Sequence, residues 1–145
     1  MRAEDEGHLR RAIGLAQEAR ARGEQPFGSL LVSAGGAVLA EDWNTMTSDG
    51  DITAHPELKL ARWAGRELSP DAARETTMYT SCEPCIMCVG AIERSGLGRV
   101  VFALSTAQFY ELEPAQTLVR DAMHVSYDGP FLLAEARTPI DGYYG

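Results

Sequence analysis

TTMYTSCEPCIMCVGAIERSGLGRVVFAL, residues 76–104, is the stretch that decides how this chain folds. A short β-rich segment, Thr76–Ser81, comes first, and Pro84 then begins a segment of helical composition that continues to Ile92. Arg99–Leu104 follows as a nearly continuous apolar run, the pattern of a strand buried on both faces. Strand and helix therefore alternate here, which predicts an α/β protein.

The residues before this stretch predict a helix, a β-hairpin and a second helix. Within Asp5–Arg22, apolar residues recur at three- and four-residue steps, as on one face of a helix. Phe27–Ala34 and Ala37–Trp43 are β-rich on either side of Gly35-Gly36, so we expect them to pair as a hairpin. Pro56–Gly65 is a mostly apolar helix. The apolar face of the first helix comprises Leu9, Ala12, Ile13, Ala16 and Ala19.

The remaining segments have weaker patterns. Thr45–Thr53 has the composition of a loop and leads to His55. Beyond Leu104 the sequence predicts a helix over Thr117–Ala122, a strand over Met123–Tyr127 and a short helix over Phe131–Arg137.

Length and composition narrow the class of protein. The chain has 145 residues, which suits one domain over residues 1–145. Apolar residues make up 45% and charged residues 23%, as in folded globular proteins and unlike disordered or fibrous ones. No apolar run approaches the ~20 residues that span a bilayer, and residues 1–11 are charged where a signal peptide would be apolar. We therefore expect a soluble, cytoplasmic protein with no membrane partner.

Charge and cysteine content narrow the function. Thirteen Lys and Arg against 21 Asp and Glu give a net charge of −8, which repels phosphate-rich partners and disfavours nucleic acid. The three cysteines, Cys82, Cys85 and Cys88, lie too close together to be a good framework for disulfides. In a reducing compartment, such a cluster favours metal binding or thiol chemistry.

Two predicted helix starts carry side chains that suit one metal ion. Cys85 and Cys88 are three residues apart, so on a helix they share a face and present two sulfur atoms. His55, at the start of the other helix, would be the third ligand. Zinc binds imidazole nitrogen at ~2.0 Å and thiolate sulfur at ~2.3 Å, and three protein ligands leave a fourth position for water. The pattern is that of a catalytic zinc site, because a structural site would fill the fourth position.

Glu57 is the candidate general acid and base. It lies two residues after His55, which makes it a poor fourth ligand but places it near the water position. Zinc lowers the pKa of its water towards ~7, and a carboxylate then takes the proton and returns it to a ring nitrogen and a leaving amine.

These residues resemble a known family. His55-Pro56-Glu57 with Pro84-Cys85-Ile86-Met87-Cys88 is similar to the zinc deaminase motif, H-x-E followed by P-C-x-x-C. Further segments resemble the guanine deaminase and tRNA adenosine deaminase branch of the cytidine deaminase-like superfamily. They are Phe27–Val32, Trp43-Asn44 and Tyr79–Cys85. The resemblance covers residues 8–104 well and thins beyond Leu104 to Gly129-Pro130 and an aromatic tail.

The resemblance implies a fold, a cofactor and an acid–base residue. The implied fold is a three-layer α/β/α sandwich around a five-stranded mixed sheet, in a chain that forms a homodimer or larger assembly. The implied cofactor is zinc (Zn2+), held by His55, Cys85 and Cys88, and Glu57 is implied to shuttle protons.

The resemblance also implies substrate contacts. Asn44 is implied to hydrogen-bond the heterocycle, Phe27 to pack against it, and the Ala54 backbone to contact it. Cys82 matches no ligand position of the family.

Simpler interpretations stay open beside these. One alternative is a zinc-containing binding module, in which the zinc is structural or the site is inactive. Pro56 keeps this alternative open, because the family more usually has alanine at that position. Asn44 also fits an ordinary turn residue at a strand end, and Phe27 an ordinary core residue.

The implied reaction is hydrolytic removal of an exocyclic amine, with release of ammonia. Enzymes that edit tRNA need a basic surface, whereas residues 121–145 hold one basic residue, Arg137, against four acidic ones. We therefore expect a free, nucleobase-sized heterocycle as substrate. A tRNA adenosine deaminase remains the alternative enzyme.

The ring itself is left open among guanine, a cytosine analogue and an amino-s-triazine. Guanine deaminases place an aspartate relay beyond the last strand, where this chain aligns Phe109, with Glu111 and Glu113 following. We expect Glu111 or Glu113 to take over as second proton relay. Relatives also cover the base with a C-terminal aromatic residue, so Tyr143 or Tyr144 is expected to close the pocket.

Overall fold

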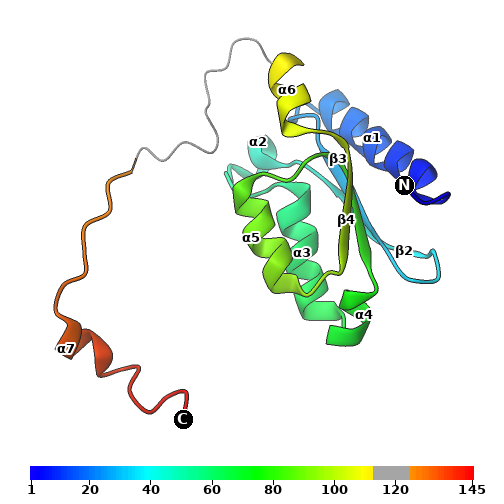
Figure 1. Cartoon of the computed structure of the whole chain (residues 1–145). Coiled ribbons are helices and arrows are strands. Elements are labelled where there is room, and N and C mark those ends of the chain that lie inside the picture. Colours follow the sequence, from blue (N-terminus) through cyan, green and yellow to red (C-terminus); the bar gives the residue numbers. More distant parts are fainter. Residues whose placement is uncertain (113–124) are drawn as a thin grey trace.

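The computed structural model describes residues 1–112 and 125–145 (Figure 1). Its elements, in chain order, are α1 (Asp5–Ala21), β1 (Gly28–Val32), β2 (Val38–Trp43), α2 (Met46–Asp49), α3 (Pro56–Glu67), α4 (Pro70–Arg74), β3 (Thr77–Cys82), α5 (Ile86–Ser95), β4 (Arg99–Leu104), α6 (Thr106–Leu112) and α7 (Leu133–Arg137). The predicted helix Asp5–Arg22, the hairpin, the helix Pro56–Gly65 and the strand–helix–strand stretch of residues 76–104 are all present. The one-turn helix α2 lies in the predicted loop, and α4 and α6 were not expected.

The strands form one mixed sheet in the order β2-β1-β3-β4. β1 is antiparallel to both β2 and β3, and β3 is parallel to β4. In Figure 1, α1 covers one face of the sheet and α3 and α5 lie side by side on the other, which gives three layers. The predicted α/β class is therefore confirmed.

The expectation of a five-stranded sheet is wrong for the described residues, which contain four strands. Residues 125–127 of the predicted strand Met123–Tyr127 are not in a strand, and its first two residues lie outside the described part. The predicted helix Thr117–Ala122 also lies outside it. The predicted helix Phe131–Arg137 is confirmed as α7. Among the described residues, no helix is both long and apolar enough to cross a membrane.

Alternating side chains of the strands fill two apolar cores, one on each face of the sheet. Leu30, Val32 and Tyr79 pack with Ala12 and Leu15 of α1. The intervening strand residues face the other helices, and this second core comprises Leu31, Leu60, Ala61, Ala64, Met78 and Ile92. The predicted face of α1 was wrong in part. Its buried stripe runs through Leu15, while Ile13 is 41% exposed.

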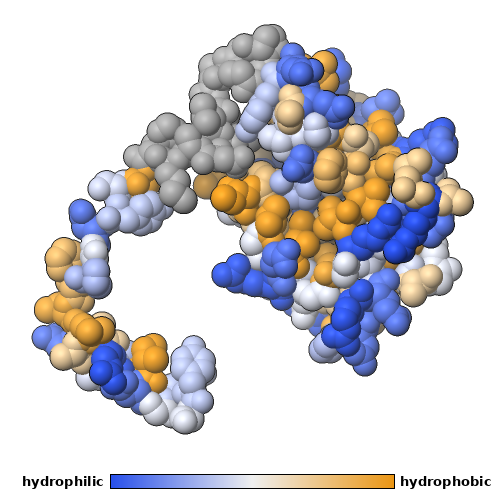
Figure 2. Space-filling model, viewed as in Figure 1, coloured by the Kyte–Doolittle hydropathy of each residue, from blue (hydrophilic) through white to orange (hydrophobic). Residues whose placement is uncertain are grey.

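β4 differs from its prediction. A strand buried on both faces was expected, but β4 lies at the edge of the sheet and is half-buried, with Phe102 exposed. Figure 2 shows an apolar patch over α5 and β4. Its exposed apolar side chains include Ile86, Val89 and Phe102. The apolar run in the sequence therefore reflects both a core face and an exposed apolar face.

A buried ion pair anchors the start of α1 to the sheet. Asp5 is fully buried and accepts two hydrogen bonds from Arg99 of β4, at 2.9 and 2.7 Å. The hydroxyl of Tyr79 on β3 donates to the same carboxylate at 2.7 Å, and the backbone N–H of Arg2 donates at 2.6 Å. The hydrogen bonds from Arg99 hold the pKa of Asp5 well below its usual range, although burial opposes them.

Asp5→Asn is therefore expected to lower Tm at pH 7, because Arg99 loses its buried counter-charge. A carboxyl group whose folded-state pKa is depressed contributes stability above its unfolded pKa of about 4, and this is lost as pH falls towards the folded value. The gap in Tm between wild type and variant should thus narrow below pH 4. Thermal unfolding followed by circular dichroism between pH 3 and 8 measures it. An equal gap at every pH would contradict the assignment.

Candidate metal and catalytic site

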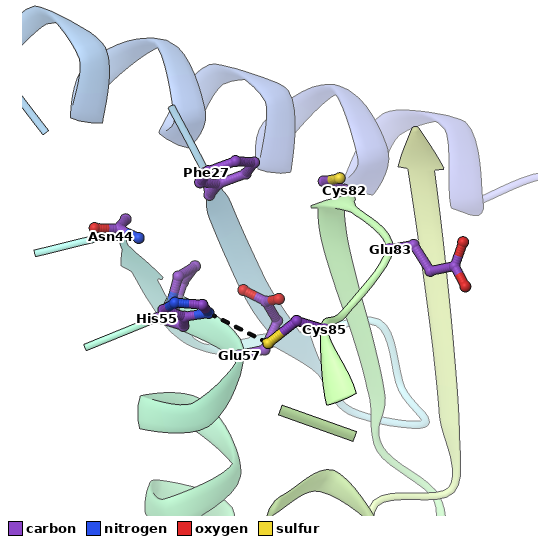
Figure 3. A pocket seen from close by; sticks show the side chains of 8 residues that line it. Phe27, Asn44, His55, Glu57, Cys82, Glu83 and Cys85 are labelled. Atoms are coloured by element: carbon purple, nitrogen blue, oxygen red, sulfur yellow. Dashed lines mark hydrogen bonds between the residues drawn. The ribbon is translucent and has the colours of Figure 1, made fainter. Parts of the chain in front are cut away.

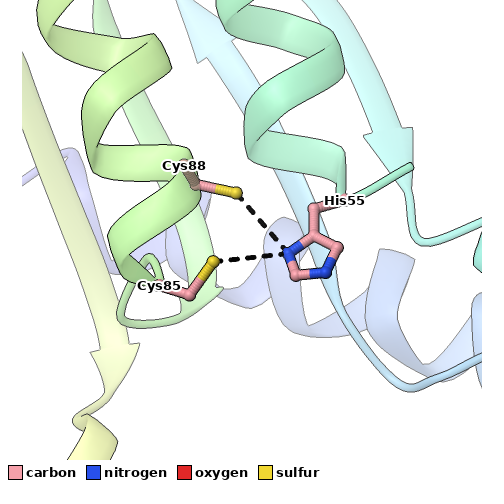
Figure 4. Close-up of side chains that lie close together, drawn as sticks. All are labelled: His55, Cys85 and Cys88. Atoms are coloured by element: carbon pink, nitrogen blue, oxygen red, sulfur yellow. Dashed lines mark hydrogen bonds between the residues drawn. The ribbon is translucent and has the colours of Figure 1, made fainter. Parts of the chain in front are cut away.

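Two helix N-termini meet at one end of the sheet and carry the candidate ligands. His55 caps α3 and Cys85 caps α5, and both have extended backbone conformations before Pro56 and Ile86 begin the helices. Cys88 lies in the first turn of α5, on the same face as Cys85. Because α3 and α5 pack side by side, the imidazole ring of one meets the two thiols of the other (Figure 4).

The three donor atoms lie at the spacing that zinc requires. Nδ1 of His55 is 3.6 Å from Sγ of Cys85 and 3.5 Å from Sγ of Cys88, and all three atoms lie within 4.8 Å of one another. Tetrahedral zinc with ordinary bond lengths separates a nitrogen and a sulfur ligand by about 3.5 Å. The donor set therefore fits zinc in both chemistry and geometry. Nδ1 is the His55 atom that is positioned to bind the ion.

The two thiols differ in acidity before any ion binds. A hydrogen bond from Cys88 and a further one from His55 lower the pKa of Cys85 far below its usual value, although burial opposes them. The hydrogen bond to Cys85, together with burial, raises the pKa of Cys88. Metal ligation requires both thiolates, so binding an ion should release a proton from Cys88.

Glu57 lies beside the ligands with its carboxylate pointing into a pocket (Figure 3). It is 6% exposed, at the first turn of α3. Burial raises the pKa of Glu57 to about 7, against smaller opposing contributions from its own backbone N–H, His55 and Ser29. A carboxyl group with this pKa takes up and gives back a proton readily near neutral pH.

The pocket around Glu57 is small and opens beside a larger apolar groove. Its enclosed volume is about 30 Å³, room for one or two water molecules. The groove beside it has a volume of about 750 Å³ and shares Phe27 and Cys82 with the pocket. The pocket is lined by Phe27, Asn44, His55, Pro56, Glu57, Cys82, Glu83 and Cys85.

The comparison with known families agrees with this site. Residues 2–104 match the cytidine and deoxycytidylate deaminase zinc-binding region. The chain belongs to this deaminase family. The family is zinc-binding, and its members hydrolyse a C–N bond in cyclic amidines.

Relatives of this deaminase fall into two groups by coverage. A probable cytosine deaminase of Schizosaccharomyces pombe is 36% identical over 97% of this chain and 92% of its own length. The tRNA-specific adenosine deaminase of Haemophilus influenzae is 38% identical, but over 70% of this chain and 58% of its own length. The crystal structure of guanine deaminase from Bacillus subtilis has a TM-score of 0.74 at 29% identity and covers 99% of this chain and 94% of its own.

The structure of the deaminase is compatible with both interpretations of Asn44, as a turn residue and as a substrate contact. Its Oδ1 accepts a hydrogen bond from the Met46 N–H at 2.9 Å, as a turn residue does. Its backbone N–H donates to the Phe27 carbonyl at 3.0 Å. Because the oxygen faces Met46, the amide nitrogen is the atom on the side of the pocket (Figure 3).

Phe27 lies at the border of the pocket and the apolar groove. It is half-buried and meets Phe109 of α6 edge to face, with ring centroids 5.6 Å apart. An ordinary core phenylalanine would be buried on all sides. The structure therefore leaves one side of the ring to the pocket and the groove.

Other predicted substrate contacts lie elsewhere. The Ala54 backbone is buried, with its N–H donating to the Asp51 carbonyl and its carbonyl accepting from the Thr45 N–H. Glu111 is exposed on α6, Tyr144 is 85% exposed after α7, and neither lines the pocket. Glu113 lies outside the described residues. The roles of these residues in binding or proton transfer stay predictions.

Glu83 lines the pocket but was not predicted as a site residue. Its Oε1 accepts a hydrogen bond from the Thr106 N–H at 3.0 Å, and its own N–H donates to the Leu104 carbonyl at 2.8 Å. It thereby ties the loop before Cys85 to the end of β4. Its place in the sequence between Cys82 and Cys85 was the signal that could have indicated a position at the pocket.

Proposed function

We propose that this protein is a zinc-dependent hydrolytic deaminase that removes an exocyclic amine from a free, nucleobase-like heterocycle. The observation that carries the proposal is the placement of Glu57, a carboxyl group that is 6% exposed, beside three metal-ligand atoms at the spacing of zinc. A binding module that held zinc for structure alone would have no chemical need for such a group. The inactive alternative is therefore disfavoured.

Zinc bound to His55, Cys85 and Cys88 would supply a Lewis acid that makes water acidic near neutral pH. In the proposed reaction, water would supply the carbonyl oxygen of the product, and the exocyclic amine would leave as ammonia. Glu57 would carry two protons in turn: the first from the water to the ring nitrogen, and the second from the hydroxyl group then on the ring carbon to the amine. Its buried position at the pocket places the Glu57 carboxyl group for both transfers.

A small heterocycle is favoured as the substrate by coverage and by charge. The cytosine deaminase and guanine deaminase relatives match almost the whole chain, whereas the tRNA-specific relative matches 70% of it. A net charge of −8 also opposes an RNA substrate. The enclosed pocket has room only for water, so the ring would lie where the pocket opens beside Phe27.

Asn44 and Phe27 would orient the ring. The amide nitrogen of Asn44 would donate a hydrogen bond to a ring or carbonyl acceptor, and the open side of Phe27 would pack against the ring. We keep Glu111 or Glu113 as the proposed second relay and Tyr144 as the proposed cover of the pocket, as the sequence predicts. We also propose a homodimer, for which the apolar patch over α5 and β4 is the candidate surface.

The substrate class is tested with paired compounds. Purified protein is assayed for ammonia release from cytosine and cytidine, guanine and guanosine, and an amino-s-triazine, with an anticodon stem-loop RNA as a further substrate. We expect at least one free ring to be used with a kcat/KM about tenfold or more above that of its nucleoside. Preference for a nucleoside or for the RNA would contradict the proposed substrate class.

A further inference from the structure

Lys59 connects the helix that carries the catalytic groups to the end of β2. It lies on α3, one turn after His55. Its Nζ donates to Oδ1 of Asp42 at 2.9 Å, to the Trp43 carbonyl at 2.8 Å and to Oγ1 of Thr45 at 2.8 Å. These three acceptors use all three N–H groups of the ammonium ion.

The acceptors of Lys59 lie on both sides of Asn44. Trp43 precedes it and Thr45 follows it, so the ammonium group bridges the backbone turn on which Asn44 is placed. The Thr45 hydroxyl in turn donates a hydrogen bond of 2.7 Å to Oδ2 of Asp49 in α2. A displacement of Lys59 would therefore move or loosen the backbone that aims the Asn44 side chain into the pocket.

The Lys59 ammonium group is more buried and has more hydrogen-bond partners than the ammonium group of an ordinary surface ion pair. The Lys59 side chain is 21% exposed, so most of it is withdrawn from water. A single carboxylate would satisfy its charge, whereas here a carboxylate, a backbone carbonyl and a hydroxyl all converge on one atom. Three acceptors around one ammonium group fix the position of the Lys59 side chain in addition to neutralising its charge.

We propose that Lys59 is a positioning residue that holds Asn44 in register with His55 and Glu57. The inference rests on the proposed function for what Asn44 binds. α3 presents His55 and Glu57 at its N-terminus, and Lys59 ties the same helix to the Asn44 turn. The substrate contact and the proton-transfer group are thereby held as one unit, within the ~0.5 Å tolerance that catalysis demands.

Lys59→Met tests the proposal because it keeps an unbranched apolar side chain of nearly the same length and removes its three donors. With the best free-ring substrate from the panel above, we expect KM to rise roughly tenfold while kcat stays within about threefold, since substrate orientation is lost and proton transfer is kept. Zinc content should not change. The matched control is Arg66→Met, a loss of charge at an exposed position two turns further along α3, with KM expected to equal that of the wild type.

A double-mutant cycle separates positioning from a general loss of stability. If Lys59 acts through Asn44, Lys59→Met should change KM by less than about twofold when Asn44 is already alanine. A second readout needs no substrate. Amide hydrogen exchange over residues 43–46 should become faster in Lys59→Met and stay unchanged in Arg66→Met.

Three results would overturn the proposal: an unchanged KM in Lys59→Met, the same tenfold rise of KM in the Asn44→Ala background, or unchanged exchange over residues 43–46. Failure of the proposed function has a different outcome. In that case the wild type releases no ammonia from any ring, and the exchange measurement alone still decides whether Lys59 holds the turn.

Discussion

Glu57→Gln is expected to lower kcat by about 10²- to 10⁴-fold, the contribution of general acid–base catalysis by one residue. The amide keeps the size of the side chain and fits the same buried place, but it cannot take up or return a proton. Glu57 serves at least two proton transfers in the proposed reaction, so the upper part of this range is expected. Steady-state ammonia release with a saturating free ring measures the effect.

The matched control is Glu67→Gln, the same substitution at an exposed position on the same helix. It should leave kcat unchanged, and both variants should keep the zinc content and Tm of the wild type closely enough to exclude misfolding. A kcat for Glu57→Gln within a few-fold of the wild type would contradict the role of Glu57. Equal losses in both variants would contradict it as well.

Cys85→Ala is expected to remove most of the zinc from the protein. Wild type should hold about one zinc ion per chain through three ligands. Loss of a ligand should cost more than the roughly 100-fold in affinity that is lost with a partner in the outer shell. Metal analysis after dialysis against a weak chelator measures the zinc content, and ammonia release should fall with it.

Cys82→Ala is the control for this result. Cys82 lies three residues before Cys85 and lines the same pocket, but it is outside the group of three donor atoms. It should keep its zinc. Zinc retained in Cys85→Ala, or lost equally in Cys82→Ala, would show that the ligand set is wrong.

The cysteine pair of the candidate ligand set could be predicted from the sequence because its spacing is local. Cys85 and Cys88 share a helix face whatever the rest of the fold does, and Pro56 and Pro84 mark the two helix starts. Glu57 follows from its place two residues after His55. The structure adds what spacing cannot give, which is the depth of burial that raises the pKa of Glu57 to about 7.

The edge position of β4 could not be predicted from its own residues. An apolar run is equally compatible with two buried faces and with one buried face beside an exposed patch, and the order of strands in the sheet decides between them. The same limit applies to α1, where small alanines allow two faces. Packing against β1 selected the face that contains Leu15 rather than Ile13.

Lys59 also had no signal in the sequence. A lysine on an amphipathic helix is normally a solvated residue, and its acceptors lie 14 to 17 positions away in the chain. These groups come into contact only when the β1–β2 hairpin has folded and the end of β2 lies beside α3. Long-range polar contacts of this kind depend on tertiary structure, and a structure is needed to find them.

The central claim is that His55, Cys85, Cys88 and Glu57 form a zinc-dependent site for hydrolytic deamination. Ammonia release from the panel of free rings, measured with chelator-stripped protein before and after one equivalent of zinc is restored, tests it most directly. The account predicts no release from the stripped protein and recovery with zinc, with one ammonia formed per ring converted to its carbonyl product. Equal release without zinc, or none from any ring by the zinc-loaded protein, would contradict it.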